Sequence, residues 1–292
     1  MQSLWMILAC AMFAVMGACI KVAAALGASL PQIVLFRGVP SVVLLVGWAL
    51  VTHRLIRPKS WRLHLWRNLA GVTAMWLGFY ALSHLPLPTA VSLNYTSPLF
   101  ITGWVLFASG IRRDFLRAIA VALGFLGVLG VLRPSIGENE FFAAMLGLCS
   151  GGLGAIAMMQ VRQLGRIGEP EWRTVLIFSA CVCLSSVGGL ALEGWRAVSW
   201  ETWAALFGLG ASGLVGQLAM TRAFGLGKAL LTAALQYTTI IFATFLGIWV
   251  WGEKPDTIAW LGMALIIAAG LLSLFCTYVE SRRLARTETI KP

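Results

Sequence analysis

The chain consists of long, uninterrupted blocks of hydrophobic residues separated by short polar segments. Apolar and polar positions do not alternate within the blocks, which argues against the strands of a transmembrane barrel. A helix of about 20 apolar residues is long enough to cross the hydrocarbon layer, and it pairs all of its backbone groups within the segment. We therefore predict an all-α integral membrane protein with ten transmembrane helices. The predicted spans are 3–26, 31–52, 64–84, 88–108, 115–133, 140–163, 170–192, 200–222, 229–251 and 257–279.

Composition agrees with this reading. Of the 292 residues, 59% are hydrophobic and 11% are charged, whereas soluble domains carry about 25% charged residues. The net charge of +11 would suggest a nucleic-acid partner in a soluble protein. We expect no such partner here, because the basic residues lie in particular loops. The six cysteines all lie in apolar blocks without a CxxC pair, so we expect neither a metal site nor disulfides.

The distribution of Lys and Arg predicts the orientation of the chain, because cytoplasmic loops retain these residues. With the N-terminus inside, three cations fall on the outer side (Arg133, Arg196 and Lys254) and two lie within spans (Lys21 and Arg37). The other 17 fall inside, so both termini should be cytoplasmic, in a bacterial inner membrane. These are Arg54, Arg57, Lys59, Arg62, Arg67, Arg112, Arg113, Arg117, Arg162, Arg166, Arg173, Arg222, Lys228, Arg282, Arg283, Arg286 and Lys291.

The two halves of the chain resemble each other. With a shift of 142 residues, Leu93 matches Leu235, Tyr95-Thr96 matches Tyr237-Thr238 and Phe100 matches Phe242; with a shift of 139, Cys10 matches Cys149. Chance matching among apolar residues is the alternative. The repeat divides the chain into units 1–136 and 137–280, followed by a cytoplasmic tail 281–292. Five spans per unit would make the two repeats inverted, a construction found in secondary transporters with a substrate site near the midplane.

Several short motifs make the chain similar to the drug/metabolite transporter superfamily, in particular its EamA-type members. The resemblance covers nearly the whole chain. The motifs are Phe13 to Lys21, Leu30-Pro31 to Phe36-Arg37, Ala81-Leu82, Leu93-Asn94-Tyr95-Thr96-Ser97-Pro98, Ala223-Phe224, Leu235-Gln236-Tyr237-Thr238 and Trp251-Gly252-Glu253. One departure is Gly110-Ile111 where the family often has a second Gly-Glu, so a role that needs both glutamates is in doubt.

The resemblance implies a secondary transporter that moves a small organic metabolite by alternating access. An amino-acid-like or aromatic solute and export are the favoured reading, and uptake of a cofactor-type solute such as S-adenosylmethionine or riboflavin is the alternative. A lipid scramblase or a structural membrane subunit is the alternative of another class. The three histidines are isolated from one another, which argues against an enzyme. The oligomeric state stays open; membrane lipids are expected partners, and no cofactor is expected.

Polar residues at membrane depth are the candidates for the substrate site, because they are costly there and usually face a cavity or a partner. Lys21 matches Gln160 between the repeats, and Asn94 matches Gln236. We predict that these four line a central cavity. Lys21 could instead snorkel to the outer interface, and the amides could form interhelical hydrogen bonds. Arg37 lies nearer the interface, so a structural role is favoured for it.

Further candidates lie beside these positions. Trp76 and Tyr80 share one helix face, and Gln217 lies on the span that corresponds to theirs. Tyr95 and Tyr237 complete the predicted set of substrate-binding residues. Pro98 is the predicted hinge, because proline removes a backbone hydrogen bond within its span. The complete set is Lys21, Trp76, Tyr80, Asn94, Tyr95, Gln160, Gln217, Gln236 and Tyr237.

The predicted spans lack two features that energy-coupled transport commonly uses, a deeply buried carboxylate and a phosphate-binding loop. No Asp or Glu lies deep in any span, so exchange without a carboxylate proton carrier is expected, or coupling through Lys21. The sequence carries no phosphate-binding loop, which argues against ATP-driven pumping.

Overall fold

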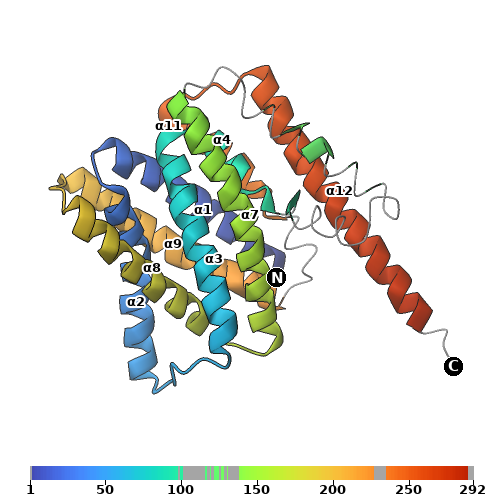
Figure 1. The fold of residues 1–292 in the computed structure, drawn as a ribbon, viewed down its shortest axis with the longest axis horizontal. Helices are drawn as coiled ribbons and strands as arrows, with labels where there is room; N and C mark the ends of the chain where they lie inside the picture. The colour runs from blue at the N-terminus through green and yellow to red at the C-terminus, as the bar shows by residue number, and fades with distance from the viewer. Residues whose placement is uncertain are drawn as a thin grey trace.

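A computed structural model describes residues 2–97, 99–100, 116, 119, 122–124, 126–127, 130, 138–226 and 235–288. All regular elements in these ranges are helices (Figure 1). They are α1 (Gln2–Ala25), α2 (Leu30–Val51), α3 (Trp61–His84), α4 (Leu87–Asn94), α7 (Glu138–Arg166), α8 (Glu171–Glu193), α9 (Trp200–Leu226), α11 (Thr238–Trp251) and α12 (Thr257–Glu288).

Several of the described helices have the dimensions of membrane spans. By length and composition, five of them are long and apolar enough to cross a bilayer: α1, α2, α7, α8 and α9. Large apolar side chains point outward on the bundle, among them Leu192 at 90% exposure and Trp249 at 76%. Such exposure would favour aggregation of a water-soluble protein but suits a lipid-facing surface. The protein is therefore an all-helical, multi-pass membrane protein.

Local sequence signals explain where several helices begin and end. Ser29 caps α2 in a capping box with Gln32, whose Oε1 accepts from the Ser29 backbone N–H at 2.9 Å. Ser60 caps α3. Gly252 ends α11 with a φ of +62°, a conformation that favours glycine. The α1–α2 connection likewise contains a glycine with positive φ, Gly27.

Non-sequential helices make the main contacts of the bundle. α1 packs chiefly on α9, α3 on α7, and α2 on α8, whereas α1–α2, α2–α3 and α7–α8 meet only marginally. The short connections predict that sequential helices pack side by side as antiparallel neighbours, but these three sequential pairs make little contact. α12 lies at one edge of the bundle (Figure 1).

Two ends of the bundle are distinguished below. The basic end carries the α2–α3 connection (residues 52–60) and the α7–α8 connection (residues 167–170), which bond to each other. The opposite end carries the α1–α2, α3–α4 and α11–α12 connections. The main apolar core lies between the ends and takes buried side chains from both halves of the chain, such as Leu93, Phe178 and Ile240.

Candidate functional site

The two matched polar motifs coincide with interruptions of helical structure. α4 ends at Asn94, Tyr95-Thr96 forms a turn, and helical structure resumes at Ser97. In the second half, Gln236-Tyr237 forms a turn between a helical Leu235 and α11. The predicted spans 88–108 and 229–251 are therefore not continuous helices at these points. Residues 101–108 and 229–234 lie outside the described residues.

Threonine hydroxyls explain part of both breaks. Thr96 Oγ1 donates to the Leu93 carbonyl at 2.7 Å, and Thr238 Oγ1 donates to the Leu235 carbonyl at 2.6 Å. These four residues match between the repeats. Hydroxyls that bond to a preceding carbonyl compete with the helical ladder and bend it. Pro98 has no N–H with which to continue the ladder, but its conformation lies outside the described residues, so its hinge role stays a prediction.

Side chains of neighbouring helices contact the backbone at the breaks. Cys10 Sγ on α1 lies 3.3 Å from the Leu235 carbonyl oxygen, to which it donates. Ser97 Oγ donates to the Gly151 carbonyl on α7 at 2.8 Å. Each break is thus held against a helix of the other half of the chain. Irregular backbone at membrane depth is tolerated where protein buries it or where it lines a cavity.

The predicted site residues at the breaks point to different surroundings. Asn94 faces Gly78 of α3, where an added methyl group would lie 3.1 Å from Asn94 Nδ2, and its buried Oδ1 has no hydrogen-bond partner among the described residues. Gln236 is buried. Tyr95 is partly buried and packs against the main apolar core. Tyr237 points to Gly270 of α12, where only a glycine leaves room for its ring.

The aromatic pair on α3 makes two separate sets of contacts. Trp76 Nε1 donates to Ser185 Oγ on α8 at 3.0 Å. Tyr80 stacks on His84 with ring centroids 4.1 Å apart, and it meets Phe142 of α7 edge-on at 5.9 Å. Trp76 therefore faces α8, while Tyr80 lies nearer the opposite end.

Arg37 lies inside the bundle and is only 3% exposed. Its Nη2 donates to Oε1 of Gln217 on α9 at 3.2 Å. Close packing against Gly213, near the middle of α9, holds the guanidinium in place, since a methyl group there would lie 2.7 Å from Nε. Arg37 therefore holds the Gln217 side chain in place. The sequence predicted that Arg37 lies nearer the membrane interface, whereas it is buried inside the bundle.

Arg67 was counted among the loop cations, and that assignment is wrong. It lies in α3 and is 4% exposed, with its guanidinium 3.7 Å from the centroid of the Phe178 ring on α8. The signal in the sequence was its position three residues after the predicted start of a span, inside the apolar run.

Lys21 forms an ion pair with Glu253 at the opposite end of the bundle. Both side chains are partly exposed, at 19% and 13%. Glu253 also accepts from the backbone N–H of Leu87, at 3.3 Å from Oε1 and 3.2 Å from Oε2, and Lys21 Nζ lies 5.0 Å from the ring centroid of Trp251. The contact joins α1 and the start of α4 to the end of α11.

Gln160 lies at the basic end, beside a cavity of about 520 Å³. Its buried Oε1 has no hydrogen-bond partner among the described residues. Because Lys21 lies at the opposite end, the structure does not bring these two matched residues together. The cavity is lined by Ser60, Arg62, Leu63, Trp66, Gln160 and Gln163.

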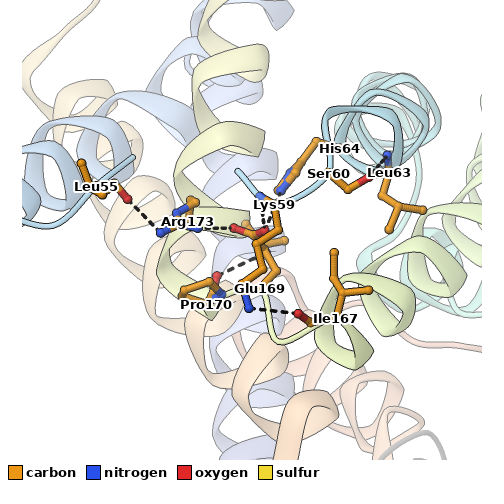
Figure 2. A network of polar contacts seen from close by, with 10 residues as sticks. Leu55, Lys59, Ser60, Leu63, His64, Ile167, Glu169, Pro170 and Arg173 are labelled. Carbon is orange, nitrogen blue, oxygen red and sulfur yellow. Dashed lines mark hydrogen bonds and ion pairs between the residues drawn. The ribbon is translucent and has the colours of Figure 1, made fainter. Parts of the chain in front are cut away.

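A buried carboxylate organises the basic end. Glu169, whose side chain has no exposed surface, accepts from Nη1 of Arg173 at 2.9 Å and from the Lys59 backbone N–H at 2.8 Å (Figure 2). His64 Nε2 lies 3.9 Å from its Oε2. Arg173 Nη2 also donates to the Leu55 carbonyl at 2.8 Å. The network ties the α2–α3 connection to the α7–α8 connection. Glu169 lies between the predicted spans 140–163 and 170–192, so hydropathy did not select it as a candidate.

The predicted site is therefore spread along the height of the bundle. Gln217 and Trp76 lie in the interior, Lys21 and Tyr80 lie toward the opposite end, and Gln160 lies toward the basic end. Over the part of the chain that the structure describes, His, Cys, Asp and Glu form no group of three or more that could hold a metal ion.

Comparison with known families gives two matches on the chain. The profile of the EamA-like transporter family matches residues 1–133 and again residues 141–275. Together the matches cover nearly all of the predicted spans.

Curated relatives carry transporter names. The pseudopaline exporter CntI of Pseudomonas aeruginosa is 28% identical over 268 residues, covering 90% of this chain and 92% of its own. The riboflavin transporter of Rhizobium johnstonii is 32% identical over 224 residues, covering 75% and 72%. The S-adenosylmethionine uptake transporter of Rickettsia prowazekii is 25% identical over 222 residues, covering 76% and 74%.

A solved crystal structure shares the fold. It superposes with a TM-score of 0.63 at 16% sequence identity, covering 97% of both chains. At this identity the likeness concerns the fold alone.

Proposed function

Because the chain belongs to the EamA-like transporter family, we propose that it is a secondary transporter that moves a small organic metabolite across the bacterial inner membrane by alternating access. We further propose an amino-acid-like or aromatic solute and the export direction. The matched pair of helix breaks, at Tyr95-Thr96 and Gln236-Tyr237, is the observation that carries this proposal. Discontinuous helices in corresponding positions of two repeats are typical of secondary transporters.

Helix packing supports an inverted repeat with two five-helix units. If 1–136 and 137–280 are equivalent, α1 corresponds to α7 and α3 to α9, so the contact of α1 with α9 should recur as a contact of α7 with α3. These are the two most extensive contacts in the bundle. α2 and α8, which also correspond, pack on each other.

Polar contacts at both ends support alternating access. The Lys21–Glu253 pair joins the two halves at the opposite end, and the Glu169 network joins them at the basic end. Breaking one set of contacts while keeping the other would expose the interior at one end only. Repeats that rock against each other around a fixed site work in this way.

The direction of transport is proposed from the cavity and the charges. The cavity opens at the basic end, which the positive-inside rule places in the cytoplasm. A solute that enters there is loaded from the cytoplasm, as export requires. Uptake of riboflavin or S-adenosylmethionine remains the second candidate, since relatives carry those names.

The test is transport into proteoliposomes with labelled amino acids, including aromatic ones, and with riboflavin and S-adenosylmethionine. We expect saturable flux of one solute class, reduced in Asn94→Ala and Gln236→Ala and unchanged in the lipid-facing control Trp249→Ala. Folded protein that moves none of these solutes would contradict the proposed substrate classes. Unchanged flux in both amide variants would contradict a role of the breaks in substrate binding.

A further inference from the structure

Two arginines are buried inside the bundle without a counter-charge among the described residues. Arg37 on α2 and Arg67 on α3 are 3% and 4% exposed, and both flank the same turn of α8: Arg67 lies against the Phe178 ring, and Gly38, the neighbour of Arg37, packs close to the Ser179 carbonyl. Within the described part of the chain, neither has an acidic partner, and no Asp or Glu lies deep in any predicted span. A charged side chain inside a membrane usually has a partner there or marks a substrate pathway. Among the described residues, no side chain supplies the counter-charge for either arginine.

Several polar atoms around the two arginines have no hydrogen-bond partner among the described residues. Nε and Nη1 of Arg67 are buried and have no hydrogen-bond partner among the described residues, and the same holds for the hydroxyls of Ser41 and Ser179. Ser41 is one turn from Arg37 on the same helix face. Ser179 follows Phe178, the ring against which Arg67 lies, and its carbonyl packs close to Gly38, the neighbour of Arg37. Buried polar groups are normally paired, so this set lacks an acceptor.

The packing fixes both guanidinium groups. Gly71 provides room for Arg67, since a methyl group there would lie 2.7 Å from Nη1, and Gly213 does the same for Arg37. The Phe178 ring holds the plane of Arg67 by a cation–π contact. A guanidinium held in place presents its paired N–H groups as a fork that matches the two oxygens of a carboxylate.

The cavity at the basic end lies beside the helix face that carries Arg67. Leu63 lines the cavity and lies four residues before Arg67 on α3, while Gln160 lines it and lies three residues after Ala157 on α7. Ala157 and Arg67 both adjoin Gly71. Residues at these spacings share one helix face, so Arg67 lies one turn deeper than the cavity lining.

We propose that Arg37 and Arg67 bind the carboxylate of the transported solute, with Gln217 orienting Arg37. This inference rests on the proposed function and deepens it: the substrate is an organic carboxylate, loaded from the basic end. Arg67 is the first of the two that the solute reaches, and its unpaired N–H groups complete their hydrogen bonds only when the solute is present.

The test uses the purified full chain with phenylalanine and phenylalaninamide, which differ only in the carboxylate, and with inorganic phosphate. Binding is measured as the rise of the thermal unfolding midpoint with ligand concentration. Phenylalanine should protect the wild type and the amide should not. In Arg67→Met and Arg37→Met, half-maximal protection by phenylalanine should need at least about tenfold more ligand. Arg67→Lys should be intermediate, and Arg57→Met, which removes an exposed cation at the same end but outside the cavity lining, should bind like the wild type.

A second measurement separates binding from a structural role. Without ligand, Arg67→Met should unfold at a higher temperature than the wild type, because an unpaired buried charge is replaced by an apolar side chain. A lower midpoint would assign Arg67 a structural role and overturn the inference. So would equal protection by the acid and the amide, or protection by phosphate alone. Saturable transport together with binding that does not depend on either arginine would overturn this inference but would support the carrier function. Binding that depends on Arg67 without any transport would support this inference but would contradict the carrier function.

Discussion

Single charged residues join the two halves of the chain at both ends. Lys21 and Glu253 form an ion pair at the opposite end. Their partial exposure places the strength of this pair between that of surface pairs and that of buried pairs. Lys21 could be selected from the sequence as an intramembrane cation, but its partner could not. Glu253 is 232 residues away, and only the packing of α1 beside α11 brings the two together.

Reversing the charge of either residue should slow transport. We expect Lys21→Glu and Glu253→Lys each to lower the transport rate about tenfold, equivalent to about 1.4 kcal/mol, because like charges would then meet at the contact. The double variant restores the attraction and should recover most of the rate. Lys254→Glu alters an exposed neighbour and serves as the control. If the double variant transported as slowly as the single variants, the attraction between residues 21 and 253 would not determine the transport rate.

Glu169 should contribute mainly to stability. Glu169→Gln removes the charge opposite Arg173 but keeps an acceptor for the Lys59 N–H. Loss of one partner from a buried pair costs about 3 kcal/mol or more, so the unfolding midpoint in detergent should fall clearly. Glu193→Gln, at an exposed position, should leave it unchanged. If Glu169→Gln had the same unfolding midpoint as the wild type, the Glu169 charge would not contribute to the stability of the protein.

At the scale of helices, five of the predicted spans are confirmed as helices long and apolar enough to cross a membrane, but sequence patterns did not predict which helices pack on one another. Hydropathy alone placed spans 31–52 and 170–192 within a residue or so of α2 and α8. The contacts of α1 with α9 and of α3 with α7 depend on packing between the halves, which periodicity does not encode. The breaks at Tyr95 and Gln236 were also missed, because apolar flanks hide the threonine–carbonyl bonds that bend the chain.

The junction of α3, α4 and α7 has no spare volume. An added methyl group at Gly78 would lie 2.8 Å from Ser150 Oγ and 3.1 Å from Asn94 Nδ2. Gly78→Ala should therefore displace Asn94 and lower transport by about tenfold, with an overpacking cost of about 1–3 kcal/mol. Gly188→Ala, a helical glycine with nothing within 4 Å of the added group, should transport normally. Equal rates for the two variants would argue that Asn94 has no part in the solute path.

At the scale of the whole molecule, the sequence predicted the class of protein and left out its buried charges. Ten apolar blocks and two related halves pointed to a membrane transporter, and the family match agrees. The arginine pair was missed because its two members belong to different helices, one read as interfacial and one as a loop residue. Burial in the folded bundle, rather than position in the sequence, distinguishes Arg67 from the exposed Arg62.

Counterflow tests the central claim most directly, namely that one solute site opens alternately at the two ends. Proteoliposomes would be preloaded with the unlabelled solute found by the panel, and entry of the labelled solute would be followed against an unloaded control. Alternating access predicts that preloading accelerates entry and produces a transient accumulation of label, because the loaded carrier returns faster than the empty one. Entry at the same rate with and without preloading would contradict a carrier, and it would favour a pore or a lipid scramblase.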